Sequence, residues 1–207
     1  MARSKSSGRW MQEHFDDHYV KQSKEQGYRS RASFKLLELH EKDKLFRPGM
    51  TVVDLGAAPG GWSQVAAQLV GDTGRVVASD ILPMDSMAGV EFVQGDFTNI
   101  DVQTKLLNLC ENNIDTILSD MSPNKTGVKK VDQWKSTALC ETVLHFAESH
   151  LKVNGNLLFK CFHGDGFEEV LKMARSIFKS VKSIKPDASR KNSTEIYLLC
   201  LAKKDKA

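Results

Sequence analysis

Long apolar runs are absent from this chain of 207 residues, in which hydrophobic residues make up 41%. No stretch is long and apolar enough to cross a bilayer, so we expect no membrane-spanning segment. The first ten residues are basic, but no apolar region follows them, which argues against a secretory signal. We therefore expect a protein of the cytoplasm.

Closely spaced cysteines are also absent. The four cysteines lie far apart at positions 110, 140, 161 and 200, and none forms a C-x-x-C pair. Mostly apolar neighbours favour reduced core residues over a disulfide framework. A zinc site would need tighter spacing and nearby histidines, so we expect no metal.

The chain has no large excess of positive or negative charge, since its net charge is only +3. The charges are nevertheless unevenly distributed along it. Residues 1–31 hold seven basic and four acidic side chains, net +3. Residues 32–170 hold twelve and nineteen, net −7, and residues 171–207 hold ten and three, net +7. Basic ends suit a polyanion such as nucleic acid, although a solvated lysine-rich surface explains them equally well.

Strand and helix patterns alternate from residue 30 onward, which predicts an α/β fold of the Rossmann-like type: a mostly parallel sheet with helices on both faces. A helix beginning at Ser30, which can cap it, should end near Lys44. The last two strands, 180–185 and 195–202, have only a short link, so the final strand should be antiparallel. We expect a basic, flexible or weakly helical N-terminal arm over 1–29 and one catalytic domain over 30–207.

The most specific local feature is D-L-G-A-A-P-G-G-W at residues 54–62, between an expected strand and helix. Gly56 and Gly60 allow a tight turn close to a ligand. The turn is not the G-x-G-x-x-G of dinucleotide enzymes, which disfavours an NAD-dependent oxidoreductase. Asp54 would repel a diphosphate and suits a cationic ligand such as S-adenosylmethionine.

Four successive expected strands end in an aspartate. Asp80 follows the second strand, where an acid can bind a ribose diol, and Asp96 follows the third, where it could accept from an adenine amine. A single such Asp is most simply a turn former, but four at equivalent strand ends indicate a binding edge. These residues are Asp54, Asp80, Asp96 and Asp120.

Three further ionisable residues are candidates for the chemistry. Lys160 ends the fifth expected strand, and Glu195 opens the last one. If that strand is antiparallel, both lie at the same rim as Asp120. Lys35 precedes the first strand, and pattern alone does not place it. The alternative for each lysine is a surface residue whose stem packs on the protein, and for Lys35 taken alone this is the simpler interpretation.

Together these motifs resemble those of the FtsJ/RrmJ family of ribosomal RNA 2'-O-methyltransferases. The segments that carry the resemblance span about residue 28 to the end; they include R-S-R-A-S-F-K-L-L-E-L, the glycine-rich turn, V-Q-G-D-F, L-S-D-M-S-P-N and K-P-D-A-S-R-K-N-S-T-E-I-Y. The resemblance implies an enzyme that takes its methyl group from S-adenosylmethionine, releases S-adenosylhomocysteine, and modifies a uridine ribose of large-subunit (23S) ribosomal RNA. We expect a monomer, because the sequence carries no signal of an interface between copies.

The resemblance also assigns roles to residues. It implies a catalytic tetrad of Lys35, Asp120, Lys160 and Glu195, in which Lys160 is the base or the polariser of the 2'-oxygen. It implies cofactor contacts at Gly60, Trp62, Asp80, Asp96 and Asp120, beside Asp54 and Gly56 from the turn. Two alternatives stay open: ribose methylation of transfer RNA or another RNA, and an RNA-binding ribosome assembly factor.

Overall fold

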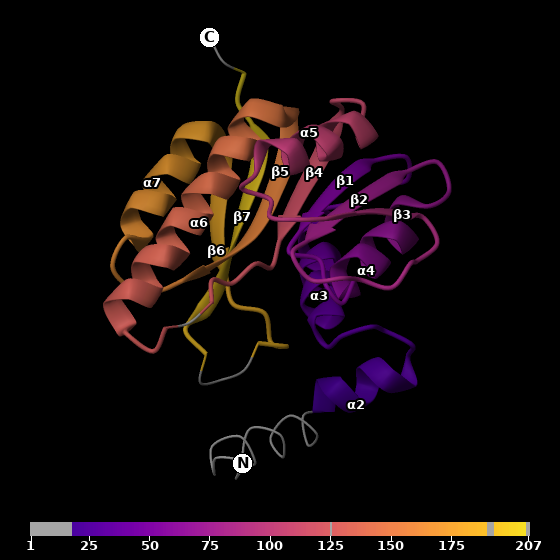
Figure 1. Ribbon diagram of the computed structural model, residues 1–207, viewed down its shortest axis with the longest axis horizontal. Coiled ribbons are helices and arrows are strands. Elements are labelled where there is room, and N and C mark those ends of the chain that lie inside the picture. Colours follow the sequence, from indigo (N-terminus) through magenta and orange to yellow (C-terminus); the bar gives the residue numbers. More distant parts are fainter. Residues whose placement is uncertain (1–17, 125, 190–192, 206–207) are drawn as a thin grey trace.

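The computed structural model describes residues 18–124, 126–189 and 193–205, and its centre is a seven-stranded sheet (Figure 1). The strand order is β3-β2-β1-β4-β5-β7-β6. Neighbouring strands from β3 to β5 are parallel, and β7 is antiparallel to both β5 and β6. The strands are β1 Thr51–Leu55, β2 Arg75–Asp80, β3 Val90–Gln94, β4 Ile114–Ser119, β5 Leu151–Phe162, β6 Phe178–Ile184 and β7 Glu195–Lys203.

Helices cover both faces of the sheet, as the alternating pattern predicted. One core cluster joins α5, α6 and α7 to the sheet, and a second joins α3 and α4 to its other face. The strands supply both clusters because successive side chains point to opposite faces: Val53 belongs to the first and Val52 to the second. The helices are α2 His18–Glu25, α3 Ala32–Asp43, α4 Gly61–Val70, α5 Ile100–Leu109, α6 Lys129–His150 and α7 Phe167–Ile177.

The antiparallel insertion of β7 confirms the expectation for the last strand. Its register sets Glu195 opposite Phe162 and Tyr197 opposite Lys160. In Figure 1 the C-terminal end of β7 points upward, so the carboxyl ends of the parallel strands lie at the lower edge of the sheet. The first residues of β7 therefore reach the edge where α/β folds bind their ligands.

The start of α3 differs from the prediction. The helix begins at Ala32, and Arg31 occupies the cap position without a side-chain hydrogen bond, so the expected cap by the Ser30 hydroxyl is wrong. The backbone carbonyl of Ser30 instead accepts from the N–H of Ser33. The helix ends as expected, with Lys44 in a left-handed conformation at φ 51°.

The described part of the predicted N-terminal arm packs on the α/β fold. Tyr19 of α2 and Tyr28 contact the Phe34 ring of α3, with ring centroids 5.6 Å and 5.5 Å apart. The Arg29 guanidinium donates to the backbone carbonyls of Asp85 and Ser86. The basic residues at positions 3, 5 and 9 of the arm lie outside the described residues.

Candidate active site

The glycine-rich turn joins β1 to α4 at the carboxyl edge of the sheet. Gly56 and Gly60 adopt positive φ angles of 76° and 103°. A Cβ at Gly56 would lie 2.3 Å from Cγ of Met121, so the turn packs directly on the segment after β4. The N–H of Ala58 donates to Asp80 over 2.9 Å, which ties the turn to the end of β2.

The four predicted aspartates do gather at this edge. Asp80, Asp96 and Asp120 line one cleft of about 690 Å³ together with Gly56. Asp54 lines an adjoining cavity of about 170 Å³, which it shares with Asp120. The two hollows adjoin each other, since Gly56 lines both. One elongated ligand with several polar groups would suit them.

Asp54 is the most unusual of the four because it is fully buried. Its Oδ2 accepts from the Ser63 hydroxyl over 2.6 Å, but its Oδ1 has no hydrogen-bond partner. Burial raises the pKa of this carboxyl to about 7, while the Ser63 hydrogen bond acts in the opposite direction. A buried carboxylate oxygen without a partner suits a ligand that carries a positive charge.

Asp80 and Asp96 are held differently. Asp80 accepts from the backbone N–H groups of Ala58 and Leu82, one on each oxygen. Asp96 accepts from the N–H and the hydroxyl of Thr98 on a single oxygen, and these hydrogen bonds lower its pKa. Both side chains are therefore fixed as acceptors that keep capacity for hydroxyl or amine donors of a ligand.

Trp62 lies in the first turn of α4 and lines the smaller cavity. Its indole N–H donates to the backbone carbonyl of Ala32 over 2.8 Å, and its ring packs on Tyr197. The side chain thus fastens α4 to α3 and β7. We conclude that the indole supports the cavity, and that the backbone of this turn offers the polar groups.

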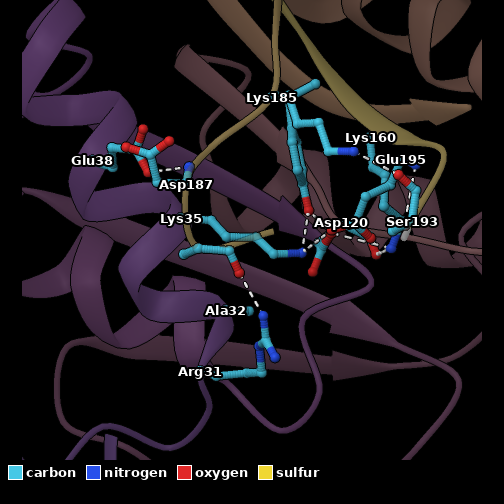
Figure 2. Close-up of polar contacts among 12 residues, drawn as sticks. Arg31, Ala32, Lys35, Glu38, Asp120, Lys160, Lys185, Asp187, Ser193 and Glu195 are labelled. Carbon is cyan, nitrogen blue, oxygen red and sulfur yellow. Dashed lines mark hydrogen bonds and ion pairs between the residues drawn. The ribbon is translucent and has the colours of Figure 1, made fainter. Parts of the chain in front are cut away.

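Two ion pairs lie beside these hollows and contain the predicted tetrad. Lys160 approaches Asp120 with its Nζ 3.1 Å from Oδ1, and it also donates to the Asp120 carbonyl oxygen over 2.5 Å. Lys35 forms the second pair with Glu195, at 2.6 Å. Figure 2 shows Lys35 extending from α3 toward Asp120, with Lys160 and Glu195 on the other side. The structure therefore brings all four residues together.

Tyr197 joins the two pairs, and the sequence analysis missed it. Its hydroxyl donates to Asp120 Oδ1 over 2.7 Å and accepts from Lys35 Nζ over 3.0 Å. Burial, followed by the charges of Asp120 and Glu195, raises the pKa of this phenol, so it stays protonated. The signal was available: in E-I-Y, Tyr197 lies two residues after Glu195 and so on the same face of β7.

The arrangement can orient and polarise a hydroxyl group. The Lys160 amine donates one hydrogen bond to the Asp120 carbonyl and forms an ion pair with its carboxylate, which leaves donor capacity for a ligand. Asp120 lines both hollows and contacts Lys160, so a group bound in them against Asp120 would lie close to this lysine. Such a site could align an attacking oxygen with a reactive carbon and stabilise charge on that oxygen.

Comparison with known proteins agrees with this geometry. The sequence model of the FtsJ-like methyltransferases matches residues 28–203. This chain belongs to the FtsJ-like methyltransferase family. It is 56% identical over 200 residues to "Ribosomal RNA large subunit methyltransferase E" of Cellvibrio japonicus, covering 96% of this chain and 95% of that protein. The protein of the same name from Pseudomonas aeruginosa PAO1 is 54% identical, with 96% and 97% covered.

Solved structures share the fold of this chain. A crystal structure assigned as a ribosomal RNA methyltransferase from Plasmodium falciparum superposes with a TM-score of 0.77 at 28% identity, covering 86% of this chain and 100% of that one. A structure assigned as an rRNA methylase from Clostridium thermocellum, at 17% identity and a TM-score of 0.56, shares the fold.

Three expected absences can be compared with the described residues. The four cysteines are buried free thiols, which confirms the prediction that they are core residues. Among the described residues, no group of three or more His, Cys, Asp or Glu side chains could hold a metal ion. None of the helices in the described ranges has the length and apolar character of a membrane span.

Proposed function

We propose that this methyltransferase transfers the methyl group of S-adenosylmethionine to the 2'-hydroxyl of a uridine in large-subunit (23S) ribosomal RNA, on the assembled 50S subunit. The observation that carries the proposal is the pair of ion pairs joined by Tyr197 beside the acidic hollows. The names of the relatives support the choice of ribosomal RNA.

The residues around the two hollows fit S-adenosylmethionine. Asp54 and its unpartnered oxygen suit the positive charge of the cofactor, Asp80 suits its ribose hydroxyls, and Asp96 suits its adenine amine. Gly60 and Trp62 would line the turn that receives the amino-acid part. When bound, the cofactor supplies a methyl group that its sulfonium makes electrophilic, and its product is S-adenosylhomocysteine.

The protein then has to position a weak nucleophile and manage one proton. Lys160 would donate an N–H to the 2'-oxygen, or would accept its proton if the amine is neutral. Asp120 orients Lys160 through two contacts. Glu195 pairs with Lys35, Lys35 donates to the Tyr197 hydroxyl, and this hydroxyl donates to Asp120, so the residues form one connected network.

The test is transfer of labelled methyl to large ribosomal subunits that lack the modification, with naked ribosomal RNA and transfer RNA alongside. We expect label on the subunits, mapped to a ribose and lost with Lys160→Ala. Lys152→Ala is a matched control because Lys152 also pairs with an aspartate, Asp115, at the opposite end of β5. That variant should keep full activity.

Other outcomes would overturn parts of the proposal. Label on transfer RNA alone would keep the reaction and refute the substrate. Cofactor binding without label on any RNA would favour an RNA-binding assembly factor. Equal loss of activity in both lysine variants would show that removing any positive charge from β5 is harmful. It would then not support a catalytic role for Lys160.

A further inference from the structure

The first turns of α6 carry apolar side chains that face away from the core. Val128, Val131 and Trp134 are 57%, 40% and 71% exposed. Val131 and Trp134 are three residues apart and so lie on the same side of the helix, and Val128 is the cap residue just before it. The buried residues of α6 begin only at Ser136. An exposed tryptophan in a row with other apolar residues points to a contact with another molecule.

This side of α6 stands between two clefts. Trp134 and Lys135 line the large cleft that also contains Asp120. Lys129 and Lys130 line a second cleft of about 590 Å³, whose other wall includes Phe162. Both clefts share Ser122 and Pro123, the residues that follow Asp120 after β4. A nucleic-acid strand that approached the tetrad from this side would pass over the start of α6.

The start of α6 is held firmly in place. Asp132 accepts from the N–H and the hydroxyl of Thr126 and from the N–H of Gly127, and these hydrogen bonds lower its pKa. The only acidic side chain in the first two turns is thus engaged by the preceding loop. The surface around Trp134 therefore combines a rigid aromatic ring with the exposed lysines Lys129 and Lys130 and the partly exposed Lys135.

We propose that this surface binds a single-stranded RNA segment next to the acceptor nucleotide: Trp134 stacks on an unpaired base, and Lys129, Lys130 and Lys135 contact its phosphates. The inference rests on the proposed function and adds a second contact for its substrate. Stacking on exposed aromatic rings between basic residues is the usual mode of single-strand recognition. The flanking lysines favour RNA over an apolar protein partner.

The first experiment compares Trp134→Ala, Trp134→Phe and Trp134→Leu. With large ribosomal subunits as substrate, the Ala variant should raise the KM for RNA by about 5- to 150-fold, the range for loss of one stacked base. The KM for S-adenosylmethionine should not change. Phe should restore most of the affinity and Leu little of it, because only an aromatic ring stacks. Val153→Ala is a control, since Val153 is 47% exposed on β5 away from this surface.

A binding measurement keeps this inference separate from the proposed function. Fluorescence anisotropy of a labelled oligouridine, with S-adenosylhomocysteine present, reports RNA binding without turnover. Changing all three lysines to Gln should make the slope of log Kd against log salt shallower by about 2. If the wild-type enzyme methylates no RNA but Trp134→Ala still weakens this binding, the proposed function is refuted and the inference about this surface stands.

Three results would overturn the inference. An increase only in the KM for S-adenosylmethionine would show that Trp134 covers the cofactor. Equal rescue by Leu and Phe would show an apolar contact typical of a protein partner. Unchanged RNA binding in both the Trp134→Ala and the lysine variants would show that this surface does not contact RNA.

Discussion

The buried carboxyl of Asp54 makes a quantitative prediction about pH. Its pKa of about 7 in the folded protein lies above the ordinary value of 3.8. Between these values the folded state binds more protons than the unfolded state, so stability falls as pH rises through this window. The full difference corresponds to about 4 kcal/mol, at about 1.4 kcal/mol per tenfold change in the ionisation constant.

The change to make is Asp54→Asn, which removes the ionisation and keeps the shape of the side chain. Without cofactor, the wild-type free energy of unfolding should fall by about 1.4 kcal/mol more than that of the variant between pH 6 and pH 8. Urea unfolding curves at the two pH values measure this difference. Other titrating groups cancel because both proteins contain them.

Cofactor binding should have the opposite dependence, because a positively charged ligand needs the ionised carboxylate. With a pKa near 7, the ionised fraction of Asp54 drops about tenfold from pH 8 to pH 6, so the Kd for S-adenosylmethionine should rise about tenfold. Asp54→Asn should bind weakly at both pH values. Ser63→Ala removes a hydrogen bond that lowers the Asp54 pKa, and should move the wild-type dependence to higher pH.

Calorimetric titrations of both proteins with S-adenosylmethionine at pH 6, 7 and 8 would test whether Asp54 causes this pH dependence. The same tenfold pH dependence in Asp54→Asn would assign the titration to another group and refute the reasoning. So would a wild-type protein whose stability changes with pH in parallel with the variant, because the carboxyl would then not be desolvated in the folded state.

Three other changes test the site. Lys160→Ala should reduce methyl transfer by about 100- to 10,000-fold while the Kd for the cofactor, measured by calorimetry, stays within about twofold. Tyr197→Phe removes the hydroxyl between the two ion pairs, so urea unfolding should show a loss of about 2 kcal/mol and kcat should fall without a change in the KM for cofactor. Gly56→Ala should cost about 2 to 4 kcal/mol in the same assay, because its Cβ would meet Met121 in a left-handed backbone. Gly27→Ala, also at a positive φ (72°) but in open space, should cost only about 1 to 2 kcal/mol; equal losses for the two glycines would refute the steric argument.

Sequence alone was sufficient for the features that depend on local pattern and chain order. The alternation of strands and helices predicted the layered sheet, and the short link before β7 predicted its antiparallel direction. Because carboxyl ends of parallel strands share an edge, the order of the strands along the chain was enough to place the aspartates near one another. Lys160 and Glu195 followed from the same argument once the direction of β7 was assumed.

The tertiary structure decided what depends on packing between distant segments. Lys35 reaches Glu195, 160 residues later, only because α3 lies against β7, and no local period encodes that distance. The same packing places Tyr197 between the ion pairs and buries Asp54, whose pKa depends on the water excluded around it. The exposure of Trp134 likewise follows from the side of α6 that the sheet covers. Periodicity specifies which residues share a face, but three-dimensional packing determines which faces meet.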